Sequence, residues 1–149
     1  MAAFLGIAQT AEVALAAATA KTVVQITAPS NHRVKVVGWG VFFDGTSATA
    51  EPVQVTLSRQ SSAGTMTSLT PVPLDDSLAE TLQVTAQHTA TAEPTTGATV
   101  GAIECHPQGG YEKIFPFSQE PICGGGDRIG IVCTAPAVVN VRAFITFEE

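Results

Sequence analysis

The chain has 149 residues, so the simplest organisation is one domain with a full hydrophobic core that needs no metal or disulfide. Only 13% of the residues are charged, against about 25% in a typical soluble domain, and 45% are hydrophobic. The net charge of −6 and the scattered basic residues argue against nucleic acid and against an anionic membrane surface as partners. A chain with so little surface charge is instead expected to be covered partly by other protein copies.

Residues 1–20 are rich in alanine and contain apolar side chains but no turn residues. No basic residue precedes the apolar part and Glu12 interrupts it, so we do not expect a signal peptide. No apolar run reaches the length of a membrane helix. We predict an extended or partly helical N-terminal arm over 1–20, beside a domain over 21–149.

The apolar residues of this arm need a cover, either the sheet of their own chain or a neighbouring subunit. We favour the neighbour, and deletion of the arm is then expected to weaken docking while leaving the domain folded. The candidate interface residues of the arm are Phe4, Leu5 and Ile7.

From residue 21 the chain consists of β-branched or alternating segments between turn residues, and no helix is available to connect parallel strands. Pro71 and Pro73 exclude a central strand from the irregular stretch 60–81. We therefore predict an all-β chain folded as an antiparallel β-sandwich, and its long connections favour an eight-stranded jelly roll. The predicted strands are 21–27, 32–43, 52–59, 82–89, 98–106, 111–117, 128–134 and 138–147.

The segment 32–43 is the most apolar of these strands, and its glycines predict a bend or a bulge. Trp39 and Phe43 share one face of it. With Phe42 they would suit a platform for stacking a sugar, but a strand this apolar is more typical of a core, so we assign them to the core.

The sequence contains no pattern typical of catalysis. The histidines are isolated, and Glu104 and His106, which share a strand face, offer two metal ligands without a third. No serine lies in a Gly-x-Ser-x-Gly context, and the glycines of 123–128 lack the Lys-Ser/Thr of a phosphate loop. We predict that the chain is not an enzyme and has no catalytic residue, cofactor or metal.

Three cysteines cannot all pair within one chain. We expect Cys105, Cys123 and Cys133 to be small core residues, with a Cys123–Cys133 bridge as the alternative.

Several motifs occur together in this chain: "DGTSATAEPVQVTLSR" (44–59), "TAEPTTG" (91–97), "HPQGGYEKIFP" (106–116) and "GDRIGIVCTAPAVVNVRA" (126–143). In this combination the chain resembles small phage virion proteins of the jelly-roll capsid decoration, or cement, type. The resemblance covers most of residues 22–149. It implies a homotrimer that is made in the host cytoplasm, binds the major capsid protein on the outer surface of the virion, and has no catalytic residue.

Residues 44–51 are small or acidic, which admits two interpretations. A turn at Asp44-Gly45 needs no partner. Alternatively, the loop passes close to another chain, where short hydroxyl side chains form hydrogen bonds at little entropic cost. The second interpretation adds four candidate interface residues: Asp44, Thr46, Ser47 and Thr49.

Three other functions compete with capsid decoration. The first is a tail or receptor-binding module of the virion built on the same sandwich. The second is a secreted trimeric lectin-like protein. The third is a metal-dependent enzyme of the cupin type.

Overall fold

The computed structural model describes residues 4–77 and 80–149, and all the strands and turns in this part of the chain belong to a β fold without helices. No helix in the described residues has the length and apolar character needed to cross a membrane. The strands are β1 (Leu5–Gln9), β2 (Val13–Leu15), β3 (Ala20–Thr27), β4 (Val34–Phe43), β5 (Val53–Gln60), β6 (Thr65–Leu69), β7 (Val72–Pro73), β8 (Thr85–Ala92), β9 (Thr96–Cys105), β10 (Gly110–Ile114), β11 (Ile122–Cys123), β12 (Arg128–Thr134) and β13 (Val139–Glu148).

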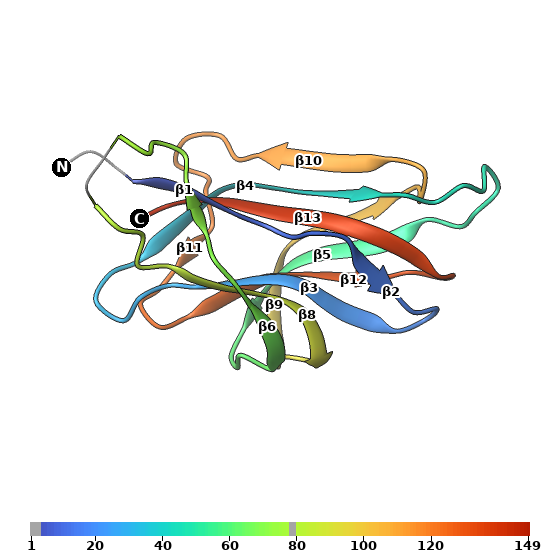
Figure 1. Ribbon diagram of the computed structural model, residues 1–149, viewed down its shortest axis with the longest axis horizontal. Helices are drawn as coiled ribbons and strands as arrows, with labels where there is room; N and C mark the ends of the chain where they lie inside the picture. The colour runs from blue at the N-terminus through green and yellow to red at the C-terminus, as the bar shows by residue number, and fades with distance from the viewer. Residues whose placement is uncertain (1–3, 78–79) are drawn as a thin grey trace.

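These strands form two antiparallel sheets that lie face to face (Figure 1). The seven-stranded sheet has the order β10-β4-β13-β1-β7, with β11 paired to β4 and β2 paired to β13. The six-stranded sheet has the order β6-β8-β3-β12-β5-β9. The predicted all-β antiparallel sandwich is confirmed.

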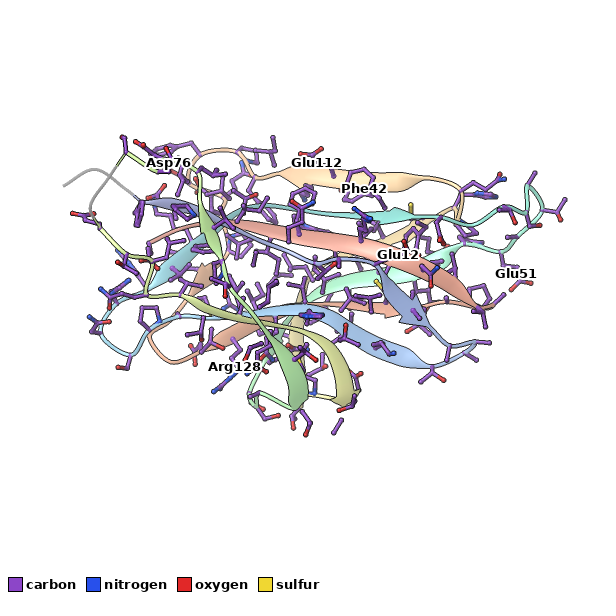
Figure 2. All side chains as sticks on the ribbon, in the orientation of Figure 1. Glu12, Phe42, Glu51, Asp76, Glu112 and Arg128 are labelled. Atoms are coloured by element: carbon purple, nitrogen blue, oxygen red, sulfur yellow. The ribbon has the colours of Figure 1, made fainter. Side chains whose placement is uncertain are left out.

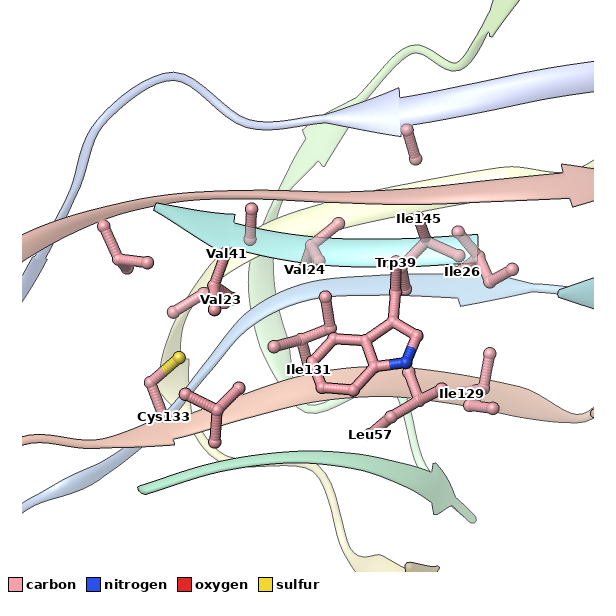
Figure 3. Close-up of a cluster of buried hydrophobic side chains, with 14 of the residues drawn as sticks. Val23, Val24, Ile26, Trp39, Val41, Leu57, Ile129, Ile131, Cys133 and Ile145 are labelled. Carbon is pink, nitrogen blue, oxygen red and sulfur yellow. The ribbon is translucent and has the colours of Figure 1, made fainter. Parts of the chain in front are cut away.

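The core lies between the sheets and surrounds Trp39 of β4 (Figure 3). Its indole is fully buried and packs close to Gly101 of β9, while the ring of Tyr111 lies 5.4 Å away between centroids. Phe43 is also buried, so the assignment of Trp39 and Phe43 to the core is confirmed. The same assignment of Phe42 is wrong, because Phe42 lies on the other face of β4 and is 48% exposed. Aliphatic side chains from both sheets complete the cluster, among them Val24, Ile26, Leu57, Ile129, Ile131 and Ile145.

A β-bulge at Val37 lets both halves of β4 face the core. Consecutive residues of β13, Thr146 and Phe147, pair with Gly38 and Val36, so Val37 has no partner position. An extra residue reverses the inward-outward alternation of a strand. The predicted bend or bulge is confirmed. It explains why the buried residues of β4 are even-numbered before the bulge and odd-numbered after it: Val34 and Val36, then Trp39, Val41 and Phe43.

Residues 5–15 belong to the seven-stranded sheet, so the structure does not confirm a separate N-terminal arm. β1 pairs with β13 from Leu5 opposite Glu148 to Gln9 opposite Phe144, and β2 pairs with the beginning of β13. Strand pairing that buries alternate residues here outweighs the helix propensity of alanine. The core includes Phe4, Ala8, Val13 and Leu15. Residues 1–3 of the predicted arm lie outside the described residues.

The stretch 60–81, predicted to be irregular, contributes two short strands, β6 and β7, both at sheet edges. β7 includes Pro73 and pairs only with β1. A proline is tolerated there because the missing N–H is not needed by a further strand.

A polar network covers part of the outer side of the six-stranded sheet. The carboxylate of Glu93 accepts hydrogen bonds from the backbone and hydroxyl of Thr22. Gln60 donates to the same hydroxyl at 3.0 Å and accepts from Gln25 at 2.7 Å. Because Thr22, Gln25 and Gln60 are all buried, the network supplies partners for polar groups that water does not reach. Among the side-chain atoms of these three residues, Oε1 of Gln25 is the one that has no partner in the described residues.

Candidate interaction surfaces

The seven-stranded sheet presents largely apolar side chains on the side away from the core. Ile114 is 70% exposed, Leu74 56% and Phe42 48%. The strand register places Ile114 and Ile7 in one row across the sheet, with Gly38 of β4 and Thr146 of β13 between them. We call the following residues the apolar outer face: Ile7, Phe42, Leu74, Ile114 and Phe144.

The rings of Phe42 and Phe144 form the centre of the apolar outer face. Their centroids are 6.3 Å apart and their planes differ by 16°. Each ring covers a glycine on the next strand: a Cβ at Gly40 would lie 2.5 Å from Cε1 of Phe144, and a Cβ at Gly110 would overlap the ring of Phe42. The glycines therefore allow both rings to lie against the sheet, which makes this part of the surface flat.

Two opposite charges lie on the same side of the sheet. Glu112 of β10 is exposed (Figure 2). Arg142 of β13 is also exposed, and β4 lies between the two strands. Arg142 pairs with Phe42 in the register, and Glu112 pairs with Gly40. Among the described residues, neither side chain forms an ion pair.

A groove of about 440 Å³ lies beside the aromatic pair. Its lining combines apolar side chains with uncharged polar ones and with one acid and one base: Ile7, Phe42, Leu74 and Phe144, then Gln9 and Thr146, then Glu112 and Arg142. A lining that combines apolar, polar and oppositely charged side chains is typical of a contact with another protein.

The second surface lies at one end of the sandwich, on the right in Figure 1, and we call it the loop end. It consists of three connections between strands: 44–52, 106–109 and 135–138. The backbone N–H of Gly45 donates to the carbonyl of Pro107 at 2.7 Å, and Nε2 of Gln108 donates to the carbonyl of Thr46 at 2.9 Å. These bonds fix the beginning of the first connection against the second.

Asp44 anchors the loop end to β13. Its two carboxylate oxygens accept hydrogen bonds from the backbone N–H and from Nδ2 of Asn140, each at 2.9 Å. Nδ2 of Asn140 also donates to Glu12 at 2.7 Å. Hydrogen bonds from Asn140 hold the pKa of Asp44 below its ordinary value of 3.8, because they stabilise the ionised carboxylate.

Beyond Asp44, the loop end is open to solvent. A groove of about 420 Å³ separates residues 45–53 from 136–139, and Val138 on its border is 77% exposed. The side chains of Thr46, Ser47 and Thr49 are exposed; the only hydrogen bond between these hydroxyls among the described residues joins Ser47 and Thr49 at 3.4 Å. The hydroxyl groups are therefore accessible to a partner.

The predicted interface residues fall into two separate regions. Phe4 is only 5% exposed and packs against its own chain, so it offers little surface to a partner. Leu5 and Ile7 lie on the outward side of the seven-stranded sheet near the end of β13. The other predicted residues lie at the loop end, near the beginning of β13: Asp44, Thr46, Ser47 and Thr49.

Sequence reasoning missed the partners of Phe42 on the apolar outer face. The alternation of 138–147 does place Arg142 and Phe144 on one face of their strand and the apolar residues that alternate with them on the other face. It does not give the register of this strand against β4, which brings Phe144 over Gly40. The sequence of each strand shows which of its residues share a face, but it does not show how the two strands pair.

The three cysteines are buried free thiols, as expected for core residues, and the Cys123–Cys133 bridge is not formed. Burial raises the pKa of all three thiols, because a thiolate loses its hydration there. A thiol with a raised pKa in an apolar environment is a poor nucleophile.

Glu104 and His106 are both exposed on β9 or directly after it, while Cys105 faces the core, as the alternation predicts. Nδ1 of His106 accepts a hydrogen bond from the backbone of Gln108 at 3.1 Å. Within residues 4–77 and 80–149, no three His, Cys, Asp or Glu side chains are grouped as metal ligands.

No protein-family model matches this chain, and no curated protein or solved structure matches it either. Its function must therefore be inferred from the sequence motifs and from the two surfaces.

Proposed function

We propose that the chain is a phage capsid decoration protein, which binds the outer surface of an assembled capsid as a homotrimer and stabilises it. The observation that carries this proposal is the apolar outer face, which exposes aliphatic and aromatic side chains on a chain with 13% charged residues. Contiguous exposed apolar surface is typical of sites where proteins bind one another.

We further propose that the sandwich is a jelly roll. Eight strands support this assignment, with the orders β1-β13-β4-β10 and β3-β12-β5-β9 in the two sheets. Along the chain these eight strands change sheet at every step except between β5 and β9. Two Greek keys that share one sandwich produce this alternation. In this scheme β1 is the first strand of the fold, and β6 to β8 are an insertion that extends the sheet edges.

The loop end is the proposed contact with the shell. Thr46, Ser47 and Thr49 present short hydroxyl side chains there, beside the exposed Val138. Short side chains lose little conformational entropy on binding, and a central apolar residue surrounded by hydrogen-bonding groups is the usual composition of a protein interface.

Stabilisation follows from mass action. A protein that binds the assembled shell but not the dispersed capsid subunits shifts the equilibrium toward the shell. At a free concentration of 100 times the dissociation constant, each occupied site contributes about 2.7 kcal/mol. No chemical step is required, and many sites on one particle act together.

The test uses shells assembled from the major capsid protein of the same phage without this chain. Added protein is expected to sediment with the shells and to raise the temperature at which they disassemble. Val138→Asp combined with Thr49→Arg is expected to abolish cosedimentation. Ser30→Arg, in the turn between β3 and β4 at the opposite end of the sandwich, is the matched control and should bind like the wild type.

Absence of binding to intact shells, with the folded wild-type protein, would overturn the proposal. In a parallel adsorption assay, binding to host cells without binding to shells would instead indicate a receptor-binding module.

A further inference from the structure

The apolar outer face carries one anion and one cation that the chain does not pair internally. Glu112 and Arg142 are exposed, and within the described residues the ion pair that the chain does form, Lys35 with Glu148 at 3.1 Å, involves neither of them. The two residues lie on opposite sides of β4, with the ring pair of Phe42 and Phe144 near them. Each therefore offers a charge to a partner that covers the rings.

The same side of the sheet is also complementary to itself in shape. The β10 half carries Ile114, which is 70% exposed and has no strand beyond it. The groove of about 440 Å³ extends from Ile7 and Leu74 to Glu112 of β10, and Arg142 also lines it. The face thus offers a protruding apolar side chain at its β10 edge and, beside it, a groove whose lining includes both charged residues.

We propose that the apolar outer face binds a second copy of this chain, with Arg142 of one copy opposite Glu112 of the next and Ile114 directed toward the groove. This inference extends the proposed function and takes from it only the number of copies, three. The contact itself does not need the shell, because it forms between free copies of the protein. A second copy is the favoured occupant because its own outer face supplies a carboxylate for Arg142 and a guanidinium for Glu112. The same face supplies a groove for Ile114 and a protruding side chain for the groove. A contact between unlike parts of one surface closes into a ring when the rotation between successive copies closes, as a trimer requires.

The overall charge also favours a specific pairing. Copies with a net charge of −6 each repel one another at long range. Self-association therefore needs a local attraction, which the desolvated apolar surface and the Arg142–Glu112 pair supply. Arg142 is well suited to this, because a guanidinium binds a carboxylate through two hydrogen bonds.

The experiment measures the mass of the free, full-length protein by light scattering and sedimentation velocity over a range of concentrations. The wild type is expected to form oligomers. Glu112→Arg and Arg142→Glu, each alone, are expected to weaken self-association at least about tenfold, because each places like charges opposite each other. The double variant Glu112→Arg/Arg142→Glu restores opposite charges and is expected to recover oligomers.

Glu104→Arg is the matched control, since it changes an exposed acid of β9 in the other sheet by the same charge and should leave the mass unchanged. Circular dichroism verifies that every variant is folded. A wild type that stays monomeric, single reversals that still assemble, or a folded double variant that stays monomeric would each overturn the proposal.

Shell binding is measured separately, so the two proposals fail separately. Oligomers that ignore shells leave this inference standing and remove the proposed function. Monomers that decorate shells remove this inference and the proposed trimer, and leave the proposed binding to the shell.

Discussion

The carboxylate of Glu93 binds Thr22 across 71 residues of sequence, accepting one hydrogen bond from the backbone N–H at 2.8 Å and one from the hydroxyl at 2.7 Å. Thr22 is completely buried, so both donors depend on this acceptor. Glu93→Ala is expected to lower the free energy of unfolding by about 2 kcal/mol, because it leaves buried donors without a partner. Urea denaturation measures the loss. Glu104→Ala, an exposed acid on the next strand along the chain, is the control and should change stability little.

Deletion of residues 1–15 is expected to unfold the domain, in contrast to the effect expected of a separate arm. Phe4, Val13 and Leu15 are buried in the core, and their loss removes about 6 kcal/mol of hydrophobic stabilisation. Domains of this kind are stable by only about 5–15 kcal/mol in total. Thermal unfolding followed by circular dichroism is the measurement. A truncated protein with an unchanged midpoint would show that β1 and β2 contribute nothing to the sandwich.

The acid sensitivity of the loop end is expected to depend on Asp44. Its pKa in the folded state lies below the ordinary value of 3.8 because Asn140 donates hydrogen bonds to the carboxylate. The stabilisation is therefore present above that ordinary value and is lost as pH falls through the lowered pKa. NMR titration of the carboxyl carbons is expected to show Asn140→Ala moving the pKa of Asp44 upward.

Asp75 provides the internal control for this titration. Its pKa is also lowered, but by hydrogen bonds from Ser77 in its own turn. Asn140→Ala should therefore leave Asp75 unchanged, and an equal shift of both aspartates would contradict the assignment.

The native protein is expected to resist thiol reagents near neutral pH. Burial raises the pKa of Cys105, Cys123 and Cys133, so the thiolate that reacts is rare in the folded state. An aromatic disulfide reagent should detect three thiols in urea and almost none without it. Because the unfolded thiols ionise at lower pH than the folded ones, stability should fall as pH rises past their ordinary value of 9.0. Rapid reaction of the folded protein at neutral pH would contradict this environment.

Trp39 is expected to tolerate phenylalanine better than its complete burial suggests. Its indole N–H is buried without a hydrogen-bond partner among the described residues, so Trp39→Phe removes no hydrogen bond. The cost should be below about 2 kcal/mol, whereas Trp39→Ala should cost about 3–5 kcal/mol through the cavity that it leaves. Urea denaturation of both variants is the measurement. Equal losses would indicate that the indole N–H has a partner, such as a buried water.

The sandwich could be predicted from the sequence because the pattern of alternating apolar residues and turns is local. The same pattern predicted that Trp39 faces the core and that β4 bends, and both expectations are confirmed. The first strand was missed because Gly6 and Ala8 weaken the apolar contrast between its two faces. The apolar outer face could not be predicted, because it depends on the register between β4 and β13, which no single segment specifies.

Phe4 and Glu149 exchange backbone hydrogen bonds in both directions, at 3.1 and 3.0 Å, at the end of the sandwich away from the loop end (Figure 1). A short linker joining these two positions would thus let the chain be circularly permuted, with new termini cut into the exposed connection 44–52. Every strand pair would be kept in such a molecule, and its free ends would emerge at the surface proposed to touch the shell. The permuted protein would then report directly on whether that end must be unobstructed for attachment.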